Sequence, residues 1–148
     1  MKSVLLVEDE RHKREELTFY LENFFRNGIK ITHVDSVREA IIEIGATPFD
    51  LVVLDMALPT FSTSGENTAG GLDQTFGGIE VIRAMKSKGV RTRIIIITQH
   101  PHITVGGKSV KLNDATSLLS TRYSQDIVGG FIYKYSAPSN QSKLVALL

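Results

Sequence analysis

The sequence contains no cysteine and no tryptophan, and only four prolines. Without cysteine, neither a disulfide framework nor a thiolate metal site can form. Charge of one sign is also missing: 17 Lys and Arg stand against 16 Asp and Glu, so no broad basic field exists to hold nucleic acid or a membrane surface. No apolar stretch approaches the roughly 18 residues of a spanning helix. The N-terminus, MKSVLLVEDE, lacks the length and cleavage site of a signal peptide. We therefore expect a cytoplasmic protein with no direct nucleic-acid or membrane binding.

The 148 residues, 42% of them hydrophobic, suit one soluble globular domain. Short apolar runs alternate along the chain with amphipathic stretches of helical spacing. Five runs are expected to be strands: residues 2–7, 29–34, 51–54, 94–97 and 131–133. Ser36 followed by Glu39 predicts the start of the second helix, and Asn113 or Asp114 is expected to cap the fourth. Strand–helix units repeated five times predict an α/β fold, a parallel sheet with helices on both faces.

Polar side chains follow four of the five expected strands. Glu8 and Asp9 follow the first, Asp55 the third, Thr98 the fourth and Lys134 the fifth. In such sheets, ligands bind at the carboxyl ends of the strands. Three carboxylates gathered there repel one another unless a cation lies among them, and hard oxygen ligands favour Mg²⁺. An Asp can form an aspartyl-phosphate, while a Lys and a Thr hydroxyl can contact the phosphoryl oxygens.

Each of these residues also has an ordinary structural interpretation. Asp9 can cap the first helix, and Asp55 can belong to the turn that contains Pro59. Thr98 can simply end a strand, and Lys134 can be a solvated charge. Their joint placement after strands one, three, four and five favours a site.

Four segments, VLLVEDE, LVVLDMALP, IIIIT and GFIYK, resemble the successive signature segments of response-regulator receiver domains of two-component signalling. The resemblance covers nearly the whole chain. It implies a flavodoxin-like, doubly wound (βα)5 fold with a five-stranded parallel sheet in the order 2-1-3-4-5. It also implies a single receiver domain over residues 1–148, with no output domain.

By this resemblance, Asp55 is the phosphoacceptor. Asp9 and Asp55 would bind Mg²⁺ (or Mn²⁺) through side-chain oxygens, Glu8 through a water molecule, and Ala57 through its backbone carbonyl. No enzymatic activity is expected beyond self-catalysed phosphorylation and dephosphorylation of Asp55.

The resemblance also assigns the residues of the switch. Thr98 and Lys134 would contact the phosphoryl group, and Phe131 would be the aromatic switch residue, although a plain core aromatic is an equal alternative. The expected partner is a histidine kinase or histidine phosphotransfer protein. Family analogy further suggests a homodimer through the face of helix four, strand five and helix five.

The sequence departs from the family in two expanded loops, at about residues 57–76 and 99–113. We hypothesise that they form a lid or a partner-recognition surface, and ordinary surface loops are the alternative. Gln99 and His100 stand where the family tunes access and phosphoryl lifetime. Tyr135 follows Lys134 where receivers commonly have proline.

Three functions are therefore compared. The complete set of acidic residues, Thr and Lys favours a phosphorylatable receiver. Gln99, Tyr135 and the long loops give some weight to a receiver-like interaction module that signals without phosphorylation. A phosphatase with an Asp nucleophile conventionally needs a general acid two residues later, and Ala57 cannot serve. His100 is the one nearby substitute, so this function ranks last.

Overall fold

The computed structural model describes residues 1–26, 28–59 and 77–148, so residues 60–76 of the loop predicted at about 57–76 lie outside these ranges. The elements follow in the order β1 (Lys2–Val7), α1 (Arg11–Phe25), β2 (Ile29–Val34), α2 (Val37–Ala46), β3 (Leu51–Asp55), α3 (Gly77–Ser87), β4 (Arg93–Thr98), β5 (His102–Val105), β6 (Lys108–Lys111), α4 (Leu112–Tyr123), β7 (Asp126–Ile132) and α5 (Ser139–Leu147).

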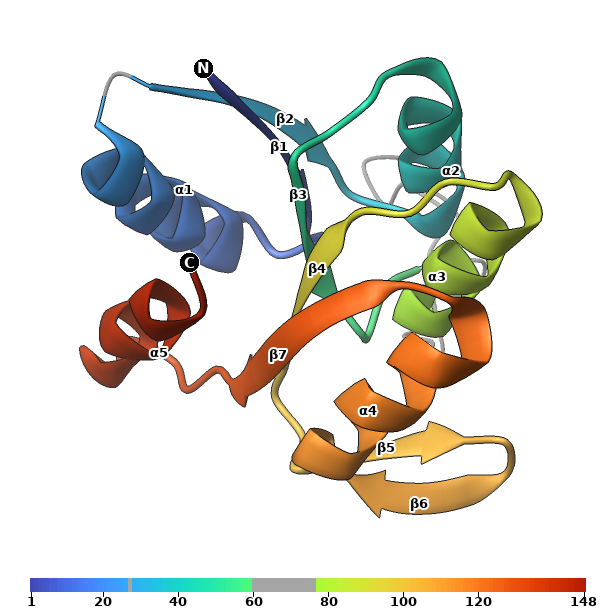
Figure 1. Ribbon diagram of the computed structural model, residues 1–148. Coiled ribbons are helices and arrows are strands. Elements are labelled where there is room, and N and C mark those ends of the chain that lie inside the picture. Colours follow the sequence, from blue (N-terminus) through green and yellow to red (C-terminus); the bar gives the residue numbers. More distant parts are fainter. Residues whose placement is uncertain (27, 60–76) are drawn as a thin grey trace, which may run out of the picture.

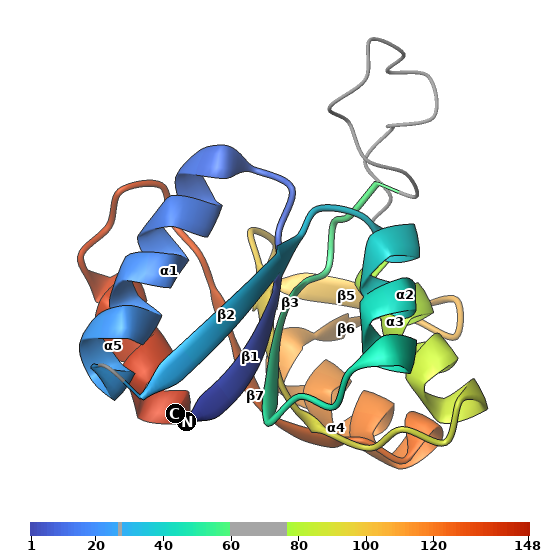
Figure 2. The ribbon, with the colours of Figure 1, turned by 90° about the horizontal axis from the view of Figure 1, so that it is seen from above.

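The central sheet has five parallel strands in the order β2-β1-β3-β4-β7. Since β7 is its fifth strand along the chain, this arrangement confirms the predicted order 2-1-3-4-5. Helices α1 and α5 cover one face, and α2, α3 and α4 cover the other (Figures 1 and 2). The fold is the doubly wound type, in which the strand order reverses beside β1 and β3.

The three inner strands β1, β3 and β4 form nearly continuous apolar runs because both of their faces are buried. Successive side chains alternate between two clusters. Val4 and Leu6 join the cluster beneath α1 and α5, whereas Leu5 and Val7 join the one beneath α2, α3 and α4. The isoleucines of β4 divide in the same way. The central sheet is thus the wall between two cores.

Helix α2 begins as its sequence predicts. Ser36 is the N-cap, and its Oγ accepts a hydrogen bond of 3.2 Å from the backbone N–H of Glu39. This confirms the predicted start and satisfies one of the free N–H groups of the first turn.

Two expectations were wrong in their boundaries. The last strand of the sheet runs from Asp126 to Ile132 rather than over residues 131–133, with a bulge where β4 passes from Ile94 to Ile95. Gly129 and Gly130 interrupt its apolar pattern, so the first part of the strand was not predicted. Helix α4 begins at Leu112 after an N-cap at Lys111, so neither Asn113 nor Asp114 caps it.

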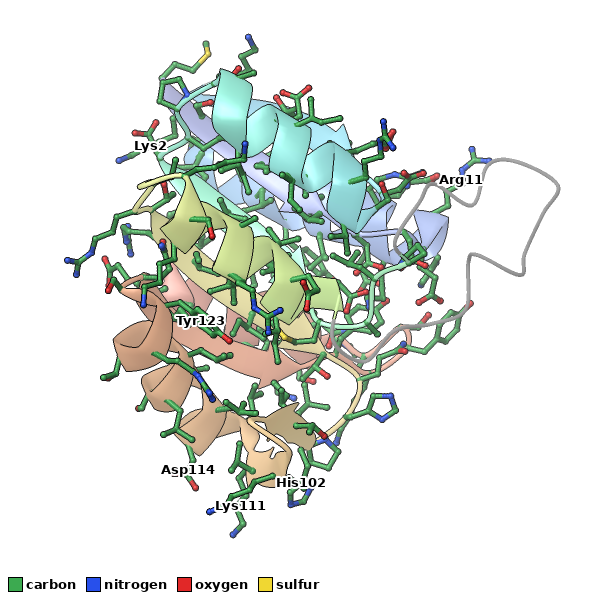
Figure 3. The ribbon with its side chains drawn as sticks, turned by 90° about the vertical axis from the view of Figure 1, so that its right-hand side faces the viewer. Lys2, Arg11, His102, Lys111, Asp114 and Tyr123 are labelled. Atoms are coloured by element: carbon green, nitrogen blue, oxygen red, sulfur yellow. The ribbon has the colours of Figure 1, made fainter. Side chains whose placement is uncertain are left out.

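The second expected loop contains a β-hairpin. Strands β5 and β6 pair antiparallel from His102 opposite Lys111 to Val105 opposite Lys108. Gly106 and Gly107, both at positive φ, form the two-residue turn, as suits a hairpin of right-handed twist. His102 and Lys111 are labelled at the hairpin in Figure 3. Among the described residues, no helix is long and apolar enough to cross a membrane.

Candidate functional site

The three carboxylates of the sequence pattern meet at the carboxyl edge of the central sheet. Glu8 follows β1, Asp55 ends β3, and each of Glu8, Asp9 and Asp55 offers a ligand oxygen within 4.8 Å of the others. Glu8 and Asp55 are almost completely buried, with 1% and 4% of their surface exposed, and Asp9 is partly exposed. Parallel strands place these groups together because their carboxyl ends share one edge.

Backbone groups hold part of this cluster in place. Asp55 Oδ1 accepts a hydrogen bond of 3.2 Å from the N–H of Ala57, and Glu8 Oε2 accepts one of 3.1 Å from the N–H of Glu10. The N-terminus of α3 packs tightly below. A Cβ at Gly78 would lie 2.8 Å from the carbonyl oxygen of Asp55, so the close approach of α3 to β3 requires a glycine there.

A lysine that the sequence reasoning missed lies within the cluster. Lys13, in the first turn of α1, is 2% exposed, and its Nζ lies 3.0 Å from Glu8 Oε1 and 3.6 Å from Asp55 Oδ2. Lys13 acts on Glu8 through its charge and through a side-chain hydrogen bond, and Glu8 Oε1 has no other hydrogen-bond partner within the described residues. Helical spacing carried the signal, because Lys13 precedes the buried Leu17 and Leu21 by four and eight residues on one helix face.

Burial sets the ionisation of these groups. It raises the pKa of Glu8 above the usual carboxyl range; the charge of Asp55 raises it further, and that of Lys13 lowers it. Burial also raises the pKa of Asp55, against the lowering effect of Lys13. For Lys13, burial alone would lower the pKa, but the charges of Asp55 and Glu8 outweigh it and raise the pKa above its ordinary value. The lysine is therefore held as a cation.

The donor set fits a hard divalent cation. Three carboxylates converge, two of them buried, and Glu8 Oε1 has no hydrogen-bond partner other than Lys13 within the described part of the chain. Asp and Glu oxygens are the ligands that Mg²⁺ prefers, and Mg²⁺ keeps several waters while it binds. Ala57, whose carbonyl was expected among the ligands, lies partly buried beside Asp55.

Thr98 lies at the end of β4 with 2% of its surface exposed. Its Oγ1 accepts a hydrogen bond of 3.0 Å from the N–H of His100, which leaves its own proton free to be donated. Gln99 and His100 are exposed. A cavity of about 150 Å³ beside Thr98 is lined by Ala57, His100, His102 and neighbouring residues, so the hairpin borders this site.

The other two predicted residues lie on β7 and just beyond it. Phe131 is 6% exposed and packs in the core beneath α1 and α5. Lys134 is exposed, and no described carboxylate lies within ion-pair distance of it. In this state the ammonium group that contacts the acidic cluster belongs to Lys13.

The segment after Lys134 keeps an ordered geometry without the family's proline. Asn140 of α5 accepts a 3.1 Å hydrogen bond from the N–H of Lys134 and donates a 2.7 Å one to its carbonyl. The ring of Tyr135 stacks on His12 of α1, with 4.6 Å between the ring centroids. These contacts fix the backbone from which the Lys134 side chain extends.

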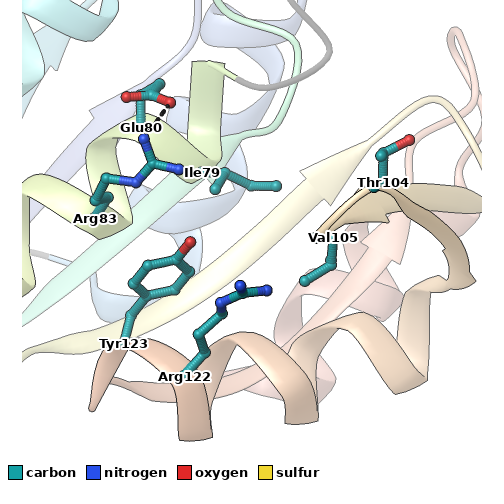
Figure 4. Close-up of a pocket in the computed structure, with 9 residues that line it drawn as sticks. Ile79, Glu80, Arg83, Thr104, Val105, Arg122 and Tyr123 are labelled. Atoms are coloured by element: carbon teal, nitrogen blue, oxygen red, sulfur yellow. Dashed lines mark hydrogen bonds and ion pairs between the residues drawn. The ribbon is translucent and has the colours of Figure 1, made fainter.

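A larger hollow of about 350 Å³ lies between α3, α4 and the hairpin turn (Figure 4). Arg83 of α3 is ion-paired with Glu80 there, at 3.1 Å. Arg122 of α4 approaches Gly106 of the turn, where an added Cβ would lie 2.7 Å from its guanidinium. This hollow holds none of the residues predicted for phosphoryl transfer.

Comparisons with known proteins show which family has this sequence and fold. The family model described as the response regulator receiver domain matches residues 4–120. The Detocs response regulatory protein DtcB of Vibrio alginolyticus is 27% identical over 122 residues, which cover 81% of this chain and 80% of that protein. The DtcB protein of Enterobacter cloacae is 29% identical over 97 residues, covering 65% and 64%.

Solved structures show the same fold. The response regulator TrrA of Thermotoga maritima, in complex with Mg²⁺ and BeF, superposes with a TM-score of 0.61 at 22% identity, covering 100% of both chains. The response regulator domain of T. maritima CheB gives a TM-score of 0.65 at 16% identity, covering 99% of this chain and 92% of that one. With the family model matching most of its length, this chain belongs to the response regulator receiver family.

Proposed function

We propose that this protein is a phosphorylatable receiver that takes a phosphoryl group on Asp55 from a histidine kinase or histidine phosphotransfer protein, in a Mg²⁺-dependent reaction, and then switches a partner-binding face. The observation that carries the proposal is the convergence of Glu8, Asp9 and Asp55 within 4.8 Å at the carboxyl edge of the sheet. Structural ion pairs alone do not need three carboxylates together at a buried edge.

The residues divide the work in the proposed transfer. A carboxylate oxygen of Asp55 forms a bond to phosphorus while the phosphorus–nitrogen bond of the donor breaks, and the histidine nitrogen keeps the electron pair. Glu8, Asp9 and Asp55, with the carbonyl of Ala57, would hold the cation, which supplies neutralisation of the charge that develops on the phosphoryl oxygens. The hydroxyl of Thr98 donates a hydrogen bond to a phosphoryl oxygen.

The switch follows from the new charge. Phosphorylation adds about −1.5 to −2 charge and new acceptor oxygens beside Thr98. Lys134 is exposed and makes no ion pair with a described carboxylate, so its ammonium group is available to pair with the phosphoryl group after transfer. A contact made in one conformation alone shifts the population toward that conformation. Phe131, in the neighbouring core, would carry the change to the face of α4, β7 and α5.

The test is an intact mass after incubation with Mg²⁺ and acetyl phosphate, and separately with a phosphorylated histidine phosphotransfer protein. A phosphoryl adduct is expected on the wild-type protein, and none with EDTA or in Asp55→Asn. An adduct that persists in Asp55→Asn would place the acceptor elsewhere.

One observation favours a second function, an interaction module that signals without phosphorylation. Lys13 already offsets part of the negative charge of Glu8 and Asp55, so the pocket holds an internal cation without a phosphoryl group or a metal. No adduct from either donor, in the presence of Mg²⁺, would support this function and refute the first.

A further inference from the structure

The ammonium group of Lys13 lies where the cation of the proposed reaction would find two of its ligands. It is 3.0 Å from Glu8 Oε1 and 3.6 Å from Asp55 Oδ2. All three side chains are nearly inaccessible, with exposed fractions of 2%, 1% and 4%. The same carboxylates are two of the three that could hold a metal ion.

Two cations cannot share these oxygens without cost. Like charges a few Å apart repel by several kcal/mol at an effective dielectric near 20, and the site is buried, so water screens the repulsion weakly. Lys13 is ion-paired with Glu8 and Asp55, and the charge of Glu10 also favours its ammonium form. The ring of Tyr133 lies under the same ammonium group, with its centroid 5.3 Å from Nζ.

We propose that Lys13 is an internal counter-ion which competes with the divalent cation, so that metal binding requires its ammonium group to leave Glu8 and Asp55. The idea rests on the proposed function only in taking these carboxylates as the metal site. Before the metal binds, the charge of Lys13 offsets part of the negative charge of the cluster. It thereby reduces the repulsion among the three carboxylates in the folded state. When the metal binds, the flexible four-carbon stem lets the ammonium group turn out toward solvent.

The first test measures Mg²⁺ affinity by isothermal titration calorimetry in wild type and in Lys13→Met, which keeps an unbranched side chain without the charge. We expect the variant to bind Mg²⁺ at least tenfold more tightly. Lys30→Met is the matched control, because it removes the same charge from an exposed position in β2 and should leave the affinity unchanged. Equal or weaker binding by Lys13→Met than by wild type would overturn the proposal.

The second test uses the wild-type protein, so it stands even if Lys13→Met folds poorly. Lysines are acetylated briefly, and the labelled fraction at Lys13 is read by peptide mass spectrometry with and without Mg²⁺ at equal ionic strength. Buried Lys13 should be protected without the metal and at least fivefold more reactive with it, while Lys30 stays constant. Unchanged protection of Lys13 at saturating Mg²⁺ would refute displacement.

Neither readout needs phosphorylation, so the two proposals fail separately. If Mg²⁺ binds, Asp55 is phosphorylated and both Lys13 tests are negative, only the counter-ion role is lost. If calorimetry detects no Mg²⁺ binding by wild type or by Lys13→Met, the metal dependence of the proposed function and the counter-ion role are both lost.

Discussion

At the scale of single residues, the contact between α1 and the β7–α5 segment depends on one carboxylate. Glu16 of α1 accepts hydrogen bonds from the hydroxyls of Tyr133 and Tyr20 and from the amide of Asn140. Burial alone would raise the pKa of Glu16, but these hydrogen bonds outweigh it and lower the pKa below its ordinary 4.5. The ionised form of Glu16 is therefore favoured by folding.

A change of Glu16 to Gln should destabilise the protein in a pH-dependent way. Because the folded-state pKa is lowered, the stabilisation is fully present above the unfolded value of 4.5 and is lost as the pH falls through the folded value. We expect Glu16→Gln to lower the free energy of unfolding by about 1–2 kcal/mol at pH 7, and the difference to shrink below pH 4.5.

Urea unfolding of both proteins across this pH range measures the difference. Glu15→Gln is the control, since Glu15 is 61% exposed and pairs with Arg11 at the surface, at 2.7 Å. Its effect should stay below about 0.5 kcal/mol. A Glu16→Gln difference that is constant with pH would show that the lost contact, not the charge, matters.

The residues that the sequence could identify are those fixed by the sheet. Glu8, Asp55 and Thr98 follow apolar runs, and the ends of parallel strands must share an edge, so their meeting could be predicted. Lys13 was missed because a single lysine on an apolar helix face is usually assumed to extend its charged end to solvent. The sequence left open whether Lys134 is a solvated charge; the structure exposes it, on a segment held by the hydrogen bonds of Asn140 and the stacking of Tyr135.

At the scale of elements, the hairpin of β5 and β6 stands where the sequence predicted an expanded loop. Its Gly-Gly pair lies between two runs with alternating apolar residues, a sequence pattern that predicts a β-hairpin. The pattern was missed because the segment was interpreted as a longer version of a receiver loop. Ile103 and Val105 of β5 pack into the core beneath α2, α3 and α4, with Leu112 of α4. The hairpin is thus part of the domain core and not an ordinary surface loop.

Shortening the Ile103 side chain should therefore cost as much as a change in the central sheet. We expect Ile103→Ala to lower the free energy of unfolding by about 2–4 kcal/mol, since Ile103 is 4% exposed and its loss leaves a cavity. Ser109→Ala, on the exposed face of β6, should change it by less than about 0.5 kcal/mol. Denaturant unfolding checks both variants, and a small effect at Ile103 would mean that the hairpin detaches easily.

At the scale of the whole molecule, the central sheet separates two cores, and the acidic cluster lies at the edge where both end. The helices on either face contribute to it: α1 supplies Lys13, and the N-terminus of α3 packs under Asp55 through Gly78. A change of charge at Asp55 therefore acts on helices of both layers, on α1 through Lys13 and on α3 through Gly78. The convergence of carboxylates suits a bound cation. Without a bound metal ion it lowers the stability of the folded state, because buried carboxylates repel one another.

Removing one of these charges should stabilise the molecule and abolish its response to the metal. In EDTA we expect Asp55→Asn to raise the free energy of unfolding by about 1 kcal/mol, or roughly 3 °C in Tm for a domain of this size. Saturating Mg²⁺ should raise the Tm of wild type, since a ligand that binds only the folded state stabilises it, and should hardly affect the variant.

Scanning calorimetry measures the Tm of wild type and of Asp55→Asn, each in EDTA and at saturating Mg²⁺. Asp126→Asn makes the same change at an exposed position, the first residue of β7, and should leave both the Tm and its Mg²⁺ response as in wild type. A fall in Tm for Asp55→Asn in EDTA would mean that the ion pair with Lys13 outweighs the repulsion among the carboxylates. The metal-free pocket would then be a stabilising feature of the fold, and Mg²⁺ binding would have to overcome that stability.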